Sequence, residues 1–195
     1  QDIQSLADDY DLKIIEFLPL DGGNGNSSYI LKTQQESYVL TVCDEKEVHE
    51  AFKMGQLLLL LEKHSVPCNR LILPVKSEIL TTFSTANGVK PVMLKGYIKG
   101  RVVEQLDEAM LSEVGVQAAR INLIPPPNYL PTYHPYGRQL FSRSVGLNID
   151  IKYESWLVKE IEYLELHILH NLPKGLIHGD LFYDNILFDS LSSAP

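Results

Sequence analysis

Two side chains near the end of the sequence, Asp180 and Asn185, have the types and the spacing that one kind of chemistry requires. Phosphoryl transfer to an alcohol needs a carboxylate beside the attacking hydroxyl and oxygen ligands for Mg²⁺. The carboxylate orients the hydroxyl or accepts its proton, while the metal neutralises the phosphates. One rigid loop supplies both groups when an aspartate and an asparagine lie five residues apart, as here. The pair therefore predicts a loop for phosphoryl transfer.

The segment around this pair, residues 176–189, reads LIHGDLFYDNILFD. Apolar pairs on both sides, Leu176-Ile177 and Ile186-Leu187, predict two short buried strands that hold a polar loop. A surface hairpin that carries polar residues by chance is the alternative. The complete pattern His-Gly-Asp-Leu-x-x-x-Asn-Ile-Leu follows a long predicted helix and a Pro-Lys-Gly turn, and this context favours the phosphoryl-transfer loop.

The loop resembles that of aminoglycoside and choline phosphotransferases, and its Leu-Phe-x-Asp-Asn ending is most similar to the homoserine kinase branch of that superfamily. The resemblance implies a protein-kinase-like fold of two lobes, ATP with Mg²⁺, and a small substrate that carries a hydroxyl. By position, Asp180 corresponds to the catalytic aspartate and Asn185 to the metal-binding asparagine. His178 joins the candidate catalytic residues as one that braces the loop. Asp184 either contacts substrate or caps a turn.

The elements that must position this loop predict an α+β fold. An antiparallel sheet with one main helix is expected in a nucleotide-binding lobe of residues 1–96. Its predicted elements are a short leading helix (2–10), strands (12–20, 29–33, 38–42, 79–85 and 91–98) and the helix (45–64).

A mostly helical lobe is expected over residues 97–195, after a hinge near residues 96–100. Asp107 can cap its first helix, which carries Met110, Val114, Ala118 and Ile121 on one face. A second helix is predicted over residues 150–171, followed by the loop with Asp180.

A nucleotide site is expected between the first two strands, at Gly22, Gly23 and Gly25, where kinases cover the phosphates. Glycines allow close backbone approach and successive amides can bind an anion, with Asn26 and Ser27 as further donors. An ordinary turn is the alternative.

The hinge of related kinases, which binds adenine through backbone groups, corresponds to residues 93–97, so Lys95 and Tyr97 join the cofactor-binding candidates. Tyr136 and Arg138, in the loop between the two helices, are candidate substrate contacts, with plain loop packing as the alternative.

Thr41 stands where most relatives carry the lysine that holds the α- and β-phosphates, and it remains a cofactor-binding candidate. A threonine does not replace an ammonium electrostatically, so Lys32 or Lys46 serves instead, or the phosphates are anchored differently. The usual helix partner of that lysine would be Glu47 or Glu50, for which a solvated helix face is the simpler interpretation.

The chain stops at Pro195, before the Ile-Asp-Phe-like segment whose aspartate is the main Mg²⁺ ligand of relatives. Asp189 lies too close to Asn185 for that role and is expected to end a strand. We therefore expect a C-terminal lobe that is incomplete, and a fragment that does not turn over by itself.

Composition excludes some functions. A formal net charge of −8 argues against nucleic-acid binding, which needs a clustered basic footprint. Cys43 and Cys68 are expected to be reduced, and the longest apolar run, residues 57–61, is too short to cross a bilayer. No signal peptide is expected. We expect a cytoplasmic protein that acts on a small molecule, with no nucleic-acid or membrane partner and no prediction of oligomeric state.

Homoserine is the first expectation for the substrate, because of the Leu-Phe-x-Asp-Asn ending. The alternatives are an aminoglycoside- or choline-type kinase, or a non-catalytic pseudokinase that binds a ligand, which Thr41 favours. A protein-directed kinase is disfavoured because Gly179 stands where its arginine would follow the histidine.

Overall fold

The computed structural model describes residues 3–20, 25–76, 78–85, 88–133, 137–169 and 171–189. The chain divides into two compact units, Gln1–Ile121 with Asp180–Pro195 and Asn122–Gly179. The lobes expected from the sequence, 1–96 and 97–195, remain a prediction.

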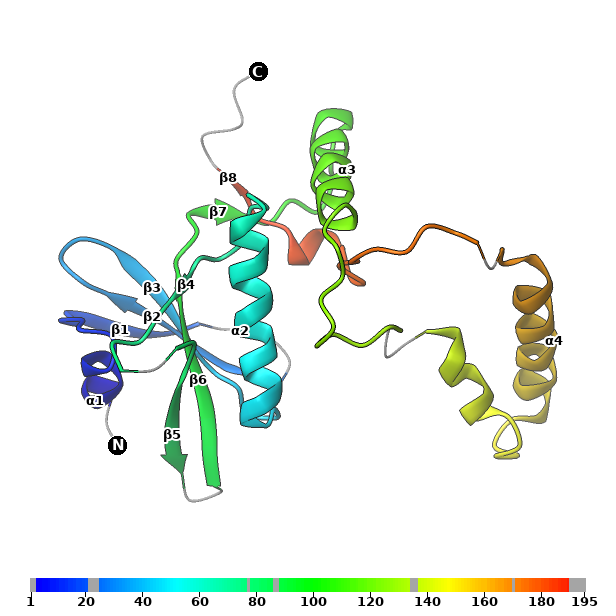
Figure 1. Ribbon diagram of the computed structural model, residues 1–195, viewed down its shortest axis with the longest axis horizontal. Helices are drawn as coiled ribbons and strands as arrows, with labels where there is room; N and C mark the ends of the chain where they lie inside the picture. The colour runs from blue at the N-terminus through cyan, green and yellow to red at the C-terminus, as the bar shows by residue number, and fades with distance from the viewer. Residues whose placement is uncertain are drawn as a thin grey trace. The chain divides into compact units, whose positions relative to one another are not determined.

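An antiparallel sheet forms the centre of the first unit (Figure 1). Its strand order is β1-β2-β3-β6-β4, and β5 pairs with β6 outside this path. The strands are β1 (Glu16–Leu20), β2 (Ser27–Lys32), β3 (Ser37–Val42), β4 (Leu71–Ile72), β5 (Thr81–Thr85) and β6 (Gly88–Gly96). The predicted α+β class with an antiparallel sheet is confirmed.

The predicted hairpin of residues 29–33 and 38–42 is confirmed, since β2 pairs with β3 and Tyr29 lies opposite Leu40. The strand predicted from residue 12 begins only at Glu16. Asp11, directly before the predicted strand, has a φ of +55° and lies in a turn, and residues 12–15 are not in a strand. Strand β4 has two residues, too few to show a period in the sequence.

Each face of the sheet packs on a different helix. Leu31, Leu40 and Leu94 point to the face covered by α1 (Ile3–Asp8), in a buried cluster with Leu6. Cys43 and Met93 point to the opposite face, in a second cluster with Ala51 of α2 (Val48–Lys63). The alternation of side chains along β3 and β6 produces the two cores.

The helix α2 packs closely at Gly55, where a Cβ would collide with the side chain of Ile79, in the segment before β5. Its first turn is closed by a capping box, in which Glu50 Oε2 accepts a hydrogen bond from the backbone N–H of Glu47 at 3.1 Å. Glu47 and Glu50, the two candidates for pairing with a strand lysine, therefore form the N-terminal cap of α2.

The remaining described elements are α3, α4, two short 3₁₀ helices and a small second sheet. Asp107 caps α3 (Glu108–Asn122), as predicted, because its Oδ1 accepts from the backbone N–H of Met110 at 2.8 Å. Asp150 caps α4, which ends earlier than predicted because Ile168 is extended. The elements are α4 (Ile151–His167), η1 (Arg138–Ser144), η2 (Tyr183–Asn185), β7 (Gly100–Arg101) and β8 (Phe188–Asp189). None of the helices in the described ranges is long and apolar enough to cross a membrane.

Candidate functional site

Asp180 and Asn185 lie together, hydrogen-bonded through their side chains. The Asn185 Nδ2 donates to the Asp180 carboxylate Oδ2 and to the Asp180 backbone oxygen, both at 3.0 Å. The amide nitrogen is thus used inside the loop. The Asn185 amide oxygen takes no part in these two hydrogen bonds, and oxygen is the atom type that Mg²⁺ prefers.

The backbone of the loop explains this proximity. Gly179 has a φ of +82°, a conformation that L side chains rarely adopt, so the chain turns sharply just before Asp180. The 3₁₀ turn η2 then closes with hydrogen bonds from Asn185 N to Phe182 O and from Ile186 N to Tyr183 O, at 3.0 and 3.2 Å. Asp180 and Asn185, five residues apart in the sequence, are thereby brought within hydrogen-bonding distance.

The loop is joined to the segment that follows β6. Strands β7 and β8 pair antiparallel, with Gly100 opposite Asp189 and Arg101 opposite Phe188. A Cβ at Gly100 would lie 3.0 Å from Phe188 O, so the glycine allows the close approach. Asp189 lies in β8 and is the last residue that the structure describes, so the predicted strand end there stays a prediction.

The strands predicted at Leu176-Ile177 and Ile186-Leu187 are wrong, since neither pair lies in a strand. Leu176 is buried, but Ile177 is 60% exposed and Leu187 is 47% exposed. The apolar pairs alternate between the interior and solvent, and the strand forms only where Gly100 admits a partner.

His178 and Asp184 are both exposed, and Asp184 lies inside η2. Asp180 and Asn185 are exposed as well. The roles assigned to these side chains stay predictions that rest on the geometry of the loop.

Only part of the predicted phosphate-binding turn is described, because Gly22 and Gly23 lie outside the described residues. Gly25 has a φ of +75°, and a Cβ there would lie 2.7 Å from Glu45 Oε2. Asn26 Oδ1 is buried with no hydrogen-bond partner in the described ranges. Ser27 Oγ donates to Asp44 Oδ2 at 2.6 Å, so its proton is engaged by a carboxylate.

Backbone groups of the predicted adenine-binding segment already hold protein partners. Gly96 N donates to Arg70 O at 2.8 Å, and Gly96 O accepts from Asn69 Nδ2 at 3.2 Å. Tyr97 N donates to Ser37 O at 3.1 Å. The Gly96 carbonyl keeps a second lone pair as acceptor capacity.

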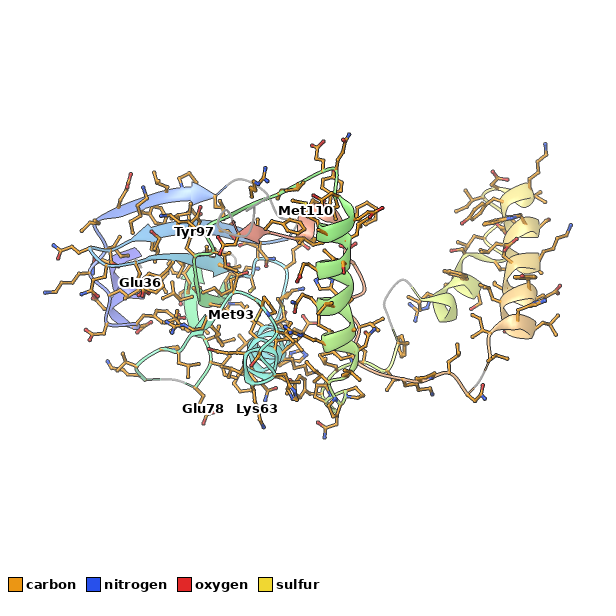
Figure 2. The ribbon with its side chains drawn as sticks, turned by 90° about the horizontal axis from the view of Figure 1, so that it is seen from above. Glu36, Lys63, Glu78, Met93, Tyr97 and Met110 are labelled. Carbon is orange, nitrogen blue, oxygen red and sulfur yellow. The ribbon has the colours of Figure 1, made fainter. Side chains whose placement is uncertain are left out.

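Thr41 shares a sheet face with Lys95, which the sequence analysis did not predict. Thr41 is 4% exposed on the sheet face toward α2, and it lies opposite Met93 of β6. Met93 is labelled beside α2 in Figure 2. Lys95, two residues beyond Met93, points to that same face, and burial lowers the pKa of its ammonium. No local sequence pattern predicts that Thr41 and Lys95 share a face, because this depends on the register between β3 and β6.

Lys32, one of the lysines considered in place of Thr41, has a carboxylate partner in the sheet. Its Nζ pairs with Glu16 Oε2 at 2.7 Å across β1 and β2. Lys32 lies five residues along β2 from Ser27, a distance of about 17 Å.

Of the predicted substrate contacts, Tyr136 lies outside the described residues. Arg138 begins η1, and its side chain is outside the described part as well. Among the side chains that are described, no group of three or more His, Cys, Asp or Glu residues is arranged to hold a metal ion.

The chain is similar to known proteins over most of its length. A model of the phosphotransferase enzyme family (APH) matches residues 16–194. The homoserine kinase of Methylobacillus flagellatus is 25% identical over 193 residues, which cover 97% of this chain and 59% of that kinase. The chain thus spans about 59% of the length of this relative.

Two solved structures have a similar fold. The spectinomycin phosphotransferase APH(9)-Ia, in complex with ADP and spectinomycin, has a TM-score of 0.71 at 16% identity, covering 98% of this chain and 65% of that one. A microcompartment-associated aminopropanol kinase has a TM-score of 0.70 at 18% identity, with the same coverage of both chains. Since the family model extends over nearly the whole sequence, the chain belongs to the phosphotransferase enzyme family.

Proposed function

We propose that this chain is the nucleotide-binding and catalytic-loop part of an ATP-dependent kinase for small molecules. The acceptor is the hydroxyl of an amino alcohol or amino acid, with homoserine as the first choice. The observation that carries the proposal is the hydrogen-bonded pair Asp180 and Asn185, held by one turn of backbone.

Each residue of the pair has a separate task. The Asp180 carboxylate orients the attacking hydroxyl and takes its proton as the bond to phosphorus forms. Asn185 holds Asp180 through its amide nitrogen and offers its amide oxygen to a cation. Because the Asn185 side chain fixes the carboxylate before substrate arrives, little reorganisation is needed during transfer.

The donor set fits a magnesium ion that is shared with a nucleotide. Mg²⁺ keeps several waters and is commonly bound by one or two protein oxygens together with substrate phosphates. Asn185 would supply one such oxygen, and bound Mg²⁺ would neutralise charge on the phosphates. The ADP in the spectinomycin phosphotransferase supports an adenine nucleotide as the donor.

Homoserine is preferred because several curated relatives at 25–28% identity over 92–97% of the chain are homoserine kinases. Aminoglycosides and choline are the alternative acceptors. Reduced cysteines are part of the same proposal, since Cys43 and Cys68 are both free, which suits a cytoplasmic enzyme.

A screen of ATP consumption by the full-length gene product tests the proposal. Homoserine, choline, hydroxylysine and an aminoglycoside are offered separately, and the Asp180→Asn variant measures background hydrolysis. We expect turnover with homoserine above the other three. Turnover with none of them, or with a protein substrate alone, contradicts the proposal.

A ligand-binding pseudokinase is the second candidate, because Thr41 is a buried neutral residue at the position where the resemblance implies a lysine in most relatives. Binding of ADP without turnover of any acceptor would favour it. The Asp180→Asn variant would then bind ADP as the unmodified protein does.

A further inference from the structure

Three polar side chains lie on the sheet face toward α2: Ser28 is opposite Thr41, and Lys95 is opposite Val39, two residues from Thr41 on the same face. Ser28, Thr41 and Lys95 lie on neighbouring strands β2, β3 and β6. The hydroxyls of Ser28 and Thr41 are 3.5 Å apart. The face toward α1 has leucines and a valine at the adjacent positions.

Lys95 is half-buried on this face. Burial is the main cause that lowers the pKa of Lys95, and the Cys43 thiol is the acidic group that raises it. No carboxylate in the described ranges has that effect on Lys95. Glu47 and Glu50, the acids at the start of α2, are used in its capping box.

We propose that the Lys95 ammonium binds the phosphates of the nucleotide, supplying from β6 the charge that Thr41 lacks on β3. A half-buried cation without an anionic partner is costly, and a bound polyphosphate removes that cost. The hydroxyls of Thr41 and Ser28 lie on the same face and are of the type that donates to phosphate oxygens. This inference rests on the proposed function, because it takes a nucleotide as the phosphoryl donor.

Three other lysines of the first unit were possible sources of this charge, and their surroundings differ from those of Lys95. Lys32 is paired with Glu16, and Lys90 Nζ donates to the backbone oxygen of Asp44. Lys46 lies between β3 and α2, and its charge lowers the pKa of the Cys43 thiol less than that of Lys95 does. Of the two lysines whose charges lower the pKa of the Cys43 thiol, Lys95 has the larger effect, and it lies opposite Val39, two residues from Thr41 on the same face.

Calorimetric titration with ADP and with adenosine tests the proposal, because the two ligands differ only in their phosphates. In Lys95→Met, ADP should bind about 10- to 100-fold more weakly, the usual effect of losing a charge-assisted hydrogen bond, while adenosine binds as before. Lys95→Arg keeps the charge and should retain most of the ADP affinity. Lys99→Met, an exposed lysine four residues further on, is the control with the same change in net charge.

Thermal melting of each variant checks the fold, and Lys95→Gln repeats the test without adding an apolar group. Equal weakening of ADP and adenosine, or an unchanged ADP affinity in Lys95→Met, overturns the inference. So does a Lys46→Met variant that loses ADP affinity while Lys95→Met does not. If the unmodified protein binds neither ligand, it is the proposed function that fails; the first three outcomes leave that function intact.

Discussion

The sheet of the first unit and the loop at residues 180–185 position their side chains by different forces. In the sheet, Leu31, Leu40 and Leu94 are at most 2% exposed, and apolar burial on the face covered by α1 holds them. In the loop, the positioned residues Asp180 and Asn185 are exposed, and hydrogen bonds within one turn hold them. The difference predicts that changes in the sheet alter the free energy of unfolding, whereas changes in the loop alter chemistry and leave the fold in place.

The largest effect is expected at the loop. Asp180→Asn should lower kcat of the full-length protein by about 10²–10⁴-fold, the scale for a positioned acid–base group. The melting temperature should stay unchanged, because Asp180 is exposed and the new amide keeps an oxygen that accepts from Asn185. Steady-state kinetics and a thermal melt measure the two quantities. Near-normal turnover would contradict the role of Asp180, and a large loss of stability would break the distinction between the two regions.

The reverse outcome is expected for the core of the sheet. Leu94→Ala should reduce the free energy of unfolding by about 2–5 kcal/mol, since Leu94 is 0% exposed between β3 and β4 and its removal leaves a cavity. Urea denaturation measures the change, and hydrogen exchange of the β6 amides locates it. A loss below 1 kcal/mol would mean that the sheet collapses readily around the gap.

Alkaline pH should reveal the same core through Tyr10. Burial raises the pKa of Tyr10 to about 12 from a usual value of 10.0, and its hydroxyl donates to Val92 O at 3.4 Å. A raised pKa in the folded state means that the stabilisation is complete below pH 10 and is lost as the pH rises toward about 12. The free energy of unfolding should fall by about 1.4 kcal/mol per pH unit in that window.

Tyr10→Phe is the matched control for this titration, because it removes the ionisable hydroxyl and keeps the ring. Urea unfolding between pH 9 and 11.5 should give a shallower decline for the variant than for the unmodified protein. Parallel declines would show that Tyr10 ionises without breaking the core.

The smallest effect is expected where exposed hydrogen bonds start a helix. Asp150 Oδ1 accepts from the backbone N–H groups of Lys152 and Tyr153, both at 3.0 Å, at the start of α4. Asp150→Ala should cost about 1 kcal/mol of helix stability, with Asp150→Asn as the control that keeps a capping oxygen. Hydrogen exchange in the first turn of α4 reports the change. A cost as large as that of Leu94→Ala would remove the contrast between burial and exposed hydrogen bonds.

The predictions that the structure confirms rest mostly on local sequence patterns. The spacing of Asp180 and Asn185, the hairpin of β2 and β3, and the cap at Asp107 all depend on residues close together in the sequence. The strands predicted from the apolar pairs around the loop are wrong because Ile177 and Leu187 are apolar but exposed. A pattern of two residues does not distinguish a buried strand from an extended coil.

The sequence by itself determined the family, the two residues of the loop and the α+β class, because these follow from a contiguous motif and from short-range hydrophobic periods. Only the tertiary structure decided that Lys95 shares a sheet face with Thr41, that Glu47 and Glu50 close a helix, and that Gly100 pairs with Asp189. Strand register and pairing across many residues are set by how side chains pack, and packing is a property of the folded chain rather than of any one segment.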